Sequence, residues 1–273
     1  MRKGKSIVSG SQGPPPGNDN KSLPVMVIGR NCLREVLKHA PQRLKQVLVA
    51  RYKGQRPEQG YAQLLASLEE HKIPVEFLDH EELSRRVNSY SHQSFAALLE
   101  PRVVPDWKSY LEDLGADEKE QAIVLALDAV TDPQNLGAIL RTAECFAVDA
   151  VIWSKNRTAP LSPSVSKASA GASELLNCFE LSNLSEGLRR LKSRNFWLVA
   201  AEAGLEAVPL EEFEFPAKCA LVMGSEGEGI SRLVQSLADY HVRISLFGKI
   251  SSLNVSQAAA IMLHAYRSRF PCR

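Results

Sequence analysis

Long apolar runs, closely spaced cysteines and metal-binding motifs are all missing from this sequence of 273 residues. The longest apolar runs, 122–127 and 258–263, fall far short of the ~18–20 residues that a membrane span needs. The five cysteines are odd in number and far apart, which argues against a disulfide framework and a cysteine zinc site. The six histidines form no H-E-x-x-H pattern. We expect a cytoplasmic protein with reduced thiols, no metal and no membrane contact; an organellar address in the basic N-terminus is the alternative.

The composition is that of a globular protein, with 44% hydrophobic and 23% charged residues. It excludes collagen, coiled coil and general disorder, and the length allows one large domain or two smaller ones. Residues 1–22 are rich in Gly, Ser, Pro and Asn, and we expect a disordered tail there. Residues 1–104 carry 16 Lys and Arg against 10 Asp and Glu, a net +6, whereas residues 105–273 carry 17 against 21, a net −4. The basic front half suggests a polyanionic partner, although an ordinary solvated surface explains it equally well.

Hydrophobic periodicity divides the rest of the chain into two α/β parts. The first part, 23–100, is predicted to form a small α/β domain, and Asn31 and Asp79 are expected to cap two of its helices. Its expected elements are strands at 25–28, 47–50, 74–78 and 95–99 and helices at 31–38, 60–71 and 81–87. Residues 101–120 contain prolines and an acidic stretch and indicate a linker with one or two helical turns.

The second part, 121–273, again alternates strands and helices. Its expected elements are strands at 123–127, 150–153, 196–200, 220–223 and 241–246 and helices at 136–146, 163–170, 184–192, 231–237 and 255–269. Because these strands are apolar on both faces, they predict a parallel sheet covered by helices on both sides.

Three polar loops follow the strands 123–127, 220–223 and 241–246 and open helices. In open parallel sheets, ligands bind at the carboxyl ends of the strands, so three such loops on one edge indicate a site. The loop 224–229 is glycine-rich but matches no nucleotide-binding fingerprint. Asp132-Pro133 is better explained as the start of a helix than as part of a metal site with Asp128.

The same three loops carry a family resemblance. Residues 132–143 read DPQNLGAILRTA, residues 221–229 read LVMGSEGEG and residues 251–256 read SSLNVS. In this order and spacing they resemble the three signature motifs of the SpoU (TrmH-like) RNA ribose 2′-O-methyltransferases, over about residues 121–270. The front part, with IGRN at 28–31 and His92-Gln93, resembles the RNA-binding domain of the RlmB-type subgroup, except that Ser94 stands where that subgroup usually has Gly. A second departure is Ser245-Leu246, where Pro-Met would be expected.

The resemblance implies a SPOUT-type parallel sheet whose C-terminal segment forms a trefoil knot, a bound S-adenosylmethionine cofactor, and a homodimer that completes the site. It assigns catalytic or substrate-contacting roles to motif residues on all three loops: Asn135, Arg141, Glu226, Ser252 and Asn254. By family spacing it assigns the cofactor to Gly224, Ile244 and Leu253. Asn135 and Asn254 could also act as helix caps, and Glu226 could pair with Arg141.

The reaction implied is methyl transfer to a ribose 2′-hydroxyl, of a guanosine in large-subunit ribosomal RNA. Because arginine stays protonated, we expect Arg141 to hold a phosphate and stabilise the developing alkoxide, with base action as the alternative. Two alternative functions remain. One is a transfer RNA ribose 2′-O-methyltransferase, and the other is a non-catalytic RNA-binding or ribosome-assembly protein on the same fold.

Overall fold

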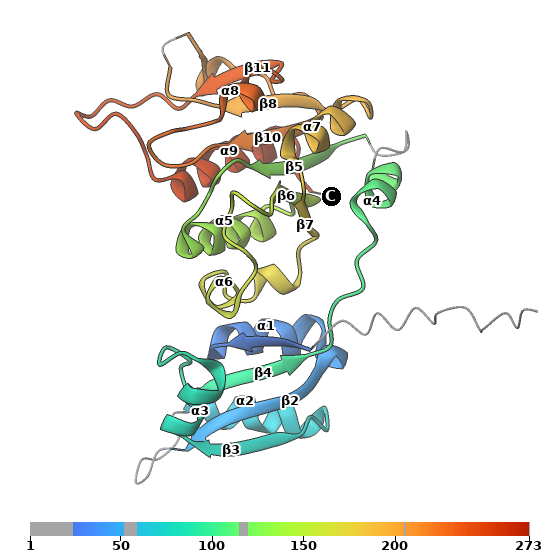
Figure 1. The fold of residues 1–273 in the computed structure, drawn as a ribbon, viewed down its shortest axis with the longest axis vertical. Helices are drawn as coiled ribbons and strands as arrows, with labels where there is room; N and C mark the ends of the chain where they lie inside the picture. The colour runs from blue at the N-terminus through green and yellow to red at the C-terminus, as the bar shows by residue number, and fades with distance from the viewer. Residues whose placement is uncertain (1–23, 52–58, 115–119, 205, 273) are drawn as a thin grey trace, which may run out of the picture.

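Two β-sheets, each with its own helices, make up the computed structural model of the protein (Figure 1). The structure describes residues 24–51, 59–114, 120–204 and 206–272. The expected tail at 1–22 lies outside the described residues. Within the described ranges, no helix combines the length and the apolar character needed to cross a bilayer.

The front sheet contains four strands in the order β1-β4-β2-β3, where β2 pairs with β3 in parallel and the other pairings are antiparallel. Its elements are β1 (Val25–Ile28), α1 (Arg30–His39), β2 (Leu44–Arg51), α2 (Gln59–Glu70), β3 (Val75–Asp79), α3 (His80–Val87) and β4 (Phe95–Leu99). Helices α1 and α2 share one hydrophobic cluster with this sheet, and α3 packs in a second. The expected strands and helices are therefore all present.

The back sheet contains seven strands in the order β7-β6-β5-β10-β8-β11-β9, and its described pairings are all parallel. Its strands are β5 (Ala122–Leu127), β6 (Ala150–Ser154), β7 (Cys178–Leu181), β8 (Trp197–Ala201), β9 (Val208–Pro209), β10 (Lys218–Met223) and β11 (Tyr240–Arg243). Its helices are α5 (Pro133–Cys145), α6 (Pro163–Ala168), α7 (Leu184–Lys192), α8 (Arg232–Gln235) and α9 (Val255–Arg269), and α4 (Trp107–Leu114) precedes it. The prediction of a mixed α/β fold with a parallel sheet is confirmed.

Alternating side chains of the central strands supply two separate cores, one on each face of the back sheet. On β5, Ile123, Leu125 and Leu127 pack with α5, α6 and α9. The intervening residues pack with α4, α7 and α8 on the other face. Both faces are thus buried, as continuous apolar strands predict. Helix α4 lies in the expected linker, yet its Leu111 and Leu114 are buried in this second core.

Side-chain caps explain where several helices begin. Asn183 accepts a hydrogen bond from the Glu186 amide at 3.2 Å, and Asn254 accepts one from the Ser256 amide at 2.8 Å, as expected. The expectation for Asn31 was wrong, because α1 starts one residue earlier behind Gly29. Asp79 occupies the cap position of α3 without a side-chain hydrogen bond to it.

Several features of the described fold differ from the sequence-based expectations. The short strands β7 and β9 were not predicted, and β11 ends at Arg243 rather than at residue 246. In the front sheet, Ser94 has φ 67°, a backbone conformation that glycine adopts more easily. The glycine that the resemblance leads one to expect after His-Gln would adopt this conformation without strain. Ser245, at the second departure, donates a hydrogen bond to Glu211 Oε2 at 3.0 Å, which proline could not do.

Candidate active site

Three loops converge at the carboxyl edge of the back sheet. They follow β5, β10 and β11, and because all three strands run parallel, their ends lie on the same edge. Strands β5 and β10 are direct neighbours in the sheet. The helix that follows the third loop, α9, packs back against α5, the helix that follows the first. This arrangement brings residues from positions 135, 226 and 254 to one place.

A hydrogen-bonded network of three side chains joins the three loops. Asn135 Nδ2 donates to Glu226 Oε1 at 3.0 Å, and Asn254 Nδ2 donates to Asn135 Oδ1 at 2.9 Å. The amide of Val255 also donates to Glu226 Oε1, at 3.4 Å. Both polar groups of the Asn135 amide are therefore held, which fixes its orientation. The structure thus unites Asn135, Glu226 and Asn254 at one site.

Asn135 and Asn254 use their side chains differently. The cap of α5 is Asp132, whose Oδ1 accepts a hydrogen bond from the Gln134 amide at 3.1 Å. Asn135 lies in the first turn of that helix, so the capping role considered for it is wrong. Asn254 caps a helix and also belongs to the network. Its Oδ1 caps α9, and its Nδ2 donates a hydrogen bond to Asn135.

The loop between β10 and α8 closes tightly on itself. The backbone of Ser225 and Gly229 exchanges two hydrogen bonds of 3.0 and 3.1 Å. A Cβ placed on Gly224 would lie 2.2 Å from the carbonyl carbon of Gly229 and 2.4 Å from the Ile230 nitrogen. Only glycine fits there, because the returning loop passes directly over its Cα. The shape of this loop, which also presents Glu226, therefore depends on residue 224.

Arg141 lies on α5 but does not join the network. It comes six residues after Asn135, and at 3.6 residues per turn its side chain is rotated by about 240° and raised by about 9 Å. It is exposed, whereas its neighbours Leu140 and Ala143 are buried. In the described part of the chain, Glu226 binds Asn135 and Val255, so the suggested pairing of Glu226 with Arg141 is not present.

The remaining motif residues lie along the third loop. Ser252 is exposed, and Leu253, which is half-buried, immediately precedes Asn254. Ile244 is half-buried at the end of β11 and packs against the core shared by α5 and α9. The loop between them exposes three large apolar side chains, Leu246, Phe247 and Ile250.

Asp128 is a structural member of the site that the sequence reasoning set aside. Its carboxylate is 2% exposed, and its Oδ2 accepts a hydrogen bond from the Ser231 amide at 2.8 Å. Its Oδ1 lies 3.4 Å from Arg157 Nη1. It therefore ties the end of β5 to the far end of the loop that carries Glu226. The sequence contained a sign of this role, because Asp128 comes directly after a fully apolar strand. A carboxylate buried there needs hydrogen-bond or charged partners.

Replacing Asp128 with alanine is expected to lower the free energy of unfolding by about 1–3 kcal/mol, because the Ser231 amide loses its buried acceptor. Urea unfolding followed by circular dichroism measures this. Asp113→Ala is the matched control: that aspartate is exposed on α4, and its loss should change the free energy by less than about 0.5 kcal/mol. Equal effects of the two substitutions would contradict the structural role of Asp128.

The part of the chain that the structure describes contains no candidate metal site. In those ranges no three His, Cys, Asp or Glu side chains come together in a way that could hold a metal ion. The site is instead built from amides, one carboxylate and backbone.

Family comparisons match both parts of the chain. Residues 122–264 match the SpoU rRNA Methylase family, and residues 26–103 match the family described as RNA 2′-O ribose methyltransferase substrate binding. A Staphylococcus aureus protein described as belonging to the TrmH family of tRNA/rRNA methyltransferases is 35% identical over 246 residues, covering 89% of this chain and 96% of that protein. The Pseudomonas aeruginosa 23S rRNA (guanosine-2′-O-)-methyltransferase RlmB is 36% identical over 247 residues, covering 90% and 97%.

Solved structures share the fold over nearly the whole length. The AdoMet-bound rRNA methyltransferase from Sinorhizobium meliloti superposes with a TM-score of 0.71 at 21% sequence identity, covering 93% of this chain and 90% of that one. An RNA methyltransferase of the TrmH family from Porphyromonas gingivalis gives a TM-score of 0.67 at 25% identity, covering 90% of each. The matches thus extend over the front sheet as well as the back sheet.

Proposed function

Because this chain belongs to the SpoU rRNA methylase family, we propose that it transfers a methyl group from S-adenosylmethionine to the 2′-hydroxyl of a guanosine ribose in large-subunit ribosomal RNA. The observation that carries the proposal is the Asn135–Glu226–Asn254 network, which joins all three signature loops. The 36% identity to the 23S rRNA enzyme of P. aeruginosa supports the choice of RNA. The proposal places the protein in the cytoplasm, together with that RNA.

The residues at the carboxyl edge suit S-adenosylmethionine. Bound there, the cofactor supplies a methyl group already activated on a sulfonium. Ile244 and Leu253 are half-buried and can contribute apolar walls for an adenine, and the loop that begins at Gly224 offers backbone donors and acceptors. Glu226 is the carboxylate of the network, and a negative charge is compatible with a cationic sulfonium. We assign the cofactor to these loops on that chemistry.

Gly224→Ala is expected to weaken S-adenosylmethionine binding about tenfold, ~1.4 kcal/mol, because the added Cβ would displace the returning backbone at Gly229. Isothermal titration calorimetry measures the change. Gly204→Ala is the control, since a Cβ there meets no atom within 4 Å. Unchanged S-adenosylmethionine affinity in Gly224→Ala would show that this loop does not bind the cofactor.

The chemical step requires the protein to position a weakly acidic ribose hydroxyl and stabilise its alkoxide. Arg141 is the proposed group for this, through contacts of its guanidinium with the phosphate and the developing charge. Asn135 and Asn254 are held in fixed orientations by Glu226 and by each other, so they can contact the nucleotide without reorganising. Ser252 is exposed on the third loop, where its hydroxyl can reach a bound substrate.

We also propose a homodimer, on the placement of Arg141. Six helical residues separate it from Asn135, so its exposed side chain leaves α5 on a different face from the network of the same chain. We propose that it completes the site of a second copy packed against α5. The exposed residues Ile261 and His264 of α9 lie on the helix that packs beside α5 and could contribute to this contact.

We also propose the domain division that the sequence suggests: a substrate-binding domain at 23–100, a linker at 101–120 and a methyltransferase domain at 121–273. The two sheets, each with its own core, support this division. In the proposal, the segment from β11 into α9 threads the trefoil knot that is characteristic of the family. The return of α9 onto α5 supports that path.

The function is tested by methyl transfer with purified protein and labelled S-adenosylmethionine on ribosomal and transfer RNA transcripts, followed by mapping of the 2′-O-methyl position. Methylation of a guanosine in large-subunit RNA is the expected result. Methylation of transfer RNA alone would identify transfer RNA as the substrate instead of ribosomal RNA. Absence of cofactor binding in calorimetry would instead identify a non-catalytic RNA-binding protein.

A further inference from the structure

Elements of the front part contact the back part at α6 and at the short helix η2 (Ala172–Glu174) (Figure 1). Strand β1 and helix α1 lie against this segment. Gly171, with φ 93°, packs so closely on α1 that a Cβ there would lie 3.1 Å from the Cα of Cys32. The Cys32 Sγ lies 3.2 Å from Ser166 Oγ. The contact is therefore a close fit of backbone against backbone.

The front-domain motif residues lie at this junction as well. The amide of Arg30, in the IGRN segment, donates to Gln93 Oε1 at 3.2 Å. A Cβ on Gly29 would lie 3.3 Å from Gln93 Oε1 and 3.4 Å from Lys167 Cγ of α6. The corner of the front sheet that carries its signature residues thus faces α6.

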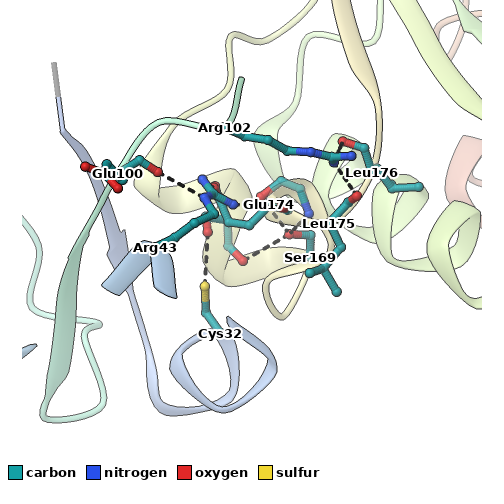
Figure 2. Close-up of polar contacts among 10 residues, drawn as sticks. Cys32, Arg43, Glu100, Arg102, Ser169, Glu174, Leu175 and Leu176 are labelled. Carbon is teal, nitrogen blue, oxygen red and sulfur yellow. Dashed lines mark hydrogen bonds and ion pairs between the residues drawn. The ribbon is translucent and has the colours of Figure 1, made fainter. Parts of the chain in front are cut away.

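Arg43 makes the central polar contact of the junction (Figure 2). Its Nη2 pairs with Glu174 Oε2 at 2.9 Å, its Nη1 donates to the Glu174 carbonyl at 2.9 Å, and its Nε donates to the Glu100 carbonyl at 3.0 Å. The side chains of Arg43 and Glu174 are only 11% and 12% exposed. Such a desolvated, forked contact is strong and directional. It connects residues 131 positions apart in the sequence.

Arg102 holds the same turn from the start of the linker (Figure 2). It donates to the carbonyls of Leu175 and Leu176, the latter at 2.9 Å, and to Asn177 Oδ1 at 2.7 Å. Two arginines therefore satisfy the carbonyl groups at the end of η2. Cations favour such carbonyl ends, so the attraction is electrostatic as well as geometric.

The docked segment continues directly into the candidate active site. Helix α6 lies against α5, and a Cβ on Gly137 would lie 2.3 Å from Ala168 Cβ. Gly137 comes two residues after Asn135, a member of the network. One continuous chain of contacts thus runs from Arg43, through η2 and α6, to Gly137 of α5.

We propose that Arg43 and Arg102 are positioning residues that dock the front domain on η2–α6, so that RNA bound by that domain meets the active-site edge in one orientation. The inference rests on the proposed function and goes beyond it by assigning substrate orientation to this junction. Arg43 acts here by fixing geometry, so it is not part of the RNA-binding surface.

A disulfide can lock the junction in the docked state. In Ser166→Cys, the new sulfur would lie near the present Oγ position and would need to move about 1 Å to bond Cys32. Diamide serves as the oxidant, and because burial raises the pKa of the Cys32 thiol to about 12, the oxidation is followed until it is complete. Diamide accepts the two electrons and two protons that the thiols lose. Wild-type protein treated with diamide controls for the other cysteines.

Three measurements are made on the full chain: methyl transfer, RNA affinity and S-adenosylmethionine affinity. Oxidised Ser166→Cys should be at least as active as its reduced form. Arg43→Ala should lower kcat/KM for RNA by about 10- to 100-fold, through misplacement of the bound nucleotide. RNA and cofactor affinities should remain near those of wild type, which also shows that the variant folds. Arg190→Ala, which removes an exposed helical pair with Glu186, is the matched control and should have no effect.

The decisive result is rescue: oxidation of the double variant Arg43→Ala/Ser166→Cys should restore activity, and dithiothreitol should remove it again. A residue that only stabilises the fold would not give this redox-dependent recovery. An inactive locked protein, an active Arg43→Ala protein or a failed rescue would each overturn the proposal. If wild type methylates no RNA, the proposed function fails instead. Docking is then tested by the rate of disulfide formation, which should be slower in Arg43→Ala/Ser166→Cys than in Ser166→Cys.

Discussion

Replacing Arg141 with alanine is expected to lower kcat for RNA methylation by about 10²–10³-fold, the usual effect of removing one donor that stabilises transition-state charge. S-adenosylmethionine affinity should stay within a few-fold of wild type, because Arg141 points away from the loops assigned to the cofactor. Arg141→Lys should recover little, since lysine keeps the charge but loses the planar fork. Residual activity above about a tenth of wild type would contradict this assignment.

A mixing experiment shows in which protomer Arg141 acts. Arg141→Ala and Glu226→Ala are each expected to be nearly inactive alone. In a mixed dimer, the intact Glu226 network of one protomer faces the intact Arg141 of the other, so one of the two sites is complete. Random exchange of protomers should therefore restore about a quarter of wild-type activity, given two-fold symmetry. No recovery after demonstrated exchange would mean that Arg141 acts within its own chain.

The fold was predictable to the extent that local pattern determines it. The buried strands β5, β6, β8 and β10 were found because they are apolar on both faces, and the start of α9 followed from the Asn254 cap. Strand β9 escaped because it has two residues, too few for a periodic signal, and β7 escaped because its four residues include the exposed Glu180. The packing of α4 against the back sheet could not be read from the acidic linker around it.

For the site, the sequence predicted that three polar loops lie at one edge of the sheet, and the structure brings Asn135, Glu226 and Asn254 of these loops together there. Their catalytic roles stay a prediction. The direction of Arg141 was in principle available, since six residues of helix turn a side chain away from its starting face. The pairing of Arg43 with Glu174 could not be predicted from the sequence. It joins residues of the two parts of the chain, 131 positions apart, and no local pattern relates them.

The second large effect is expected when the two parts are separated. We expect the fragment 105–273 to fold and to bind S-adenosylmethionine, because it retains α4, whose Leu111 and Leu114 belong to its core, and all three signature loops. We expect it to methylate RNA barely at all, because it carries a net charge of −4 and lacks the front domain with its share of the +6 at 1–104. Cofactor affinity within a few-fold of the whole protein is the test of folding.

Salt dependence of RNA binding separates the contributions of the two parts. For the intact protein, the affinity should fall by roughly 0.7–0.9 decades per decade of salt for every phosphate contacted. The structure removes Arg43 from the cations available for this, because its guanidinium is occupied by Glu174 and nearly buried. Exposed cations such as Lys38 and Arg85 remain. The isolated fragment should show a much shallower slope. Equal slopes together with equal methylation would mean that the front domain does not bind the RNA, and the assignment of ribosomal RNA would lose its support from this domain.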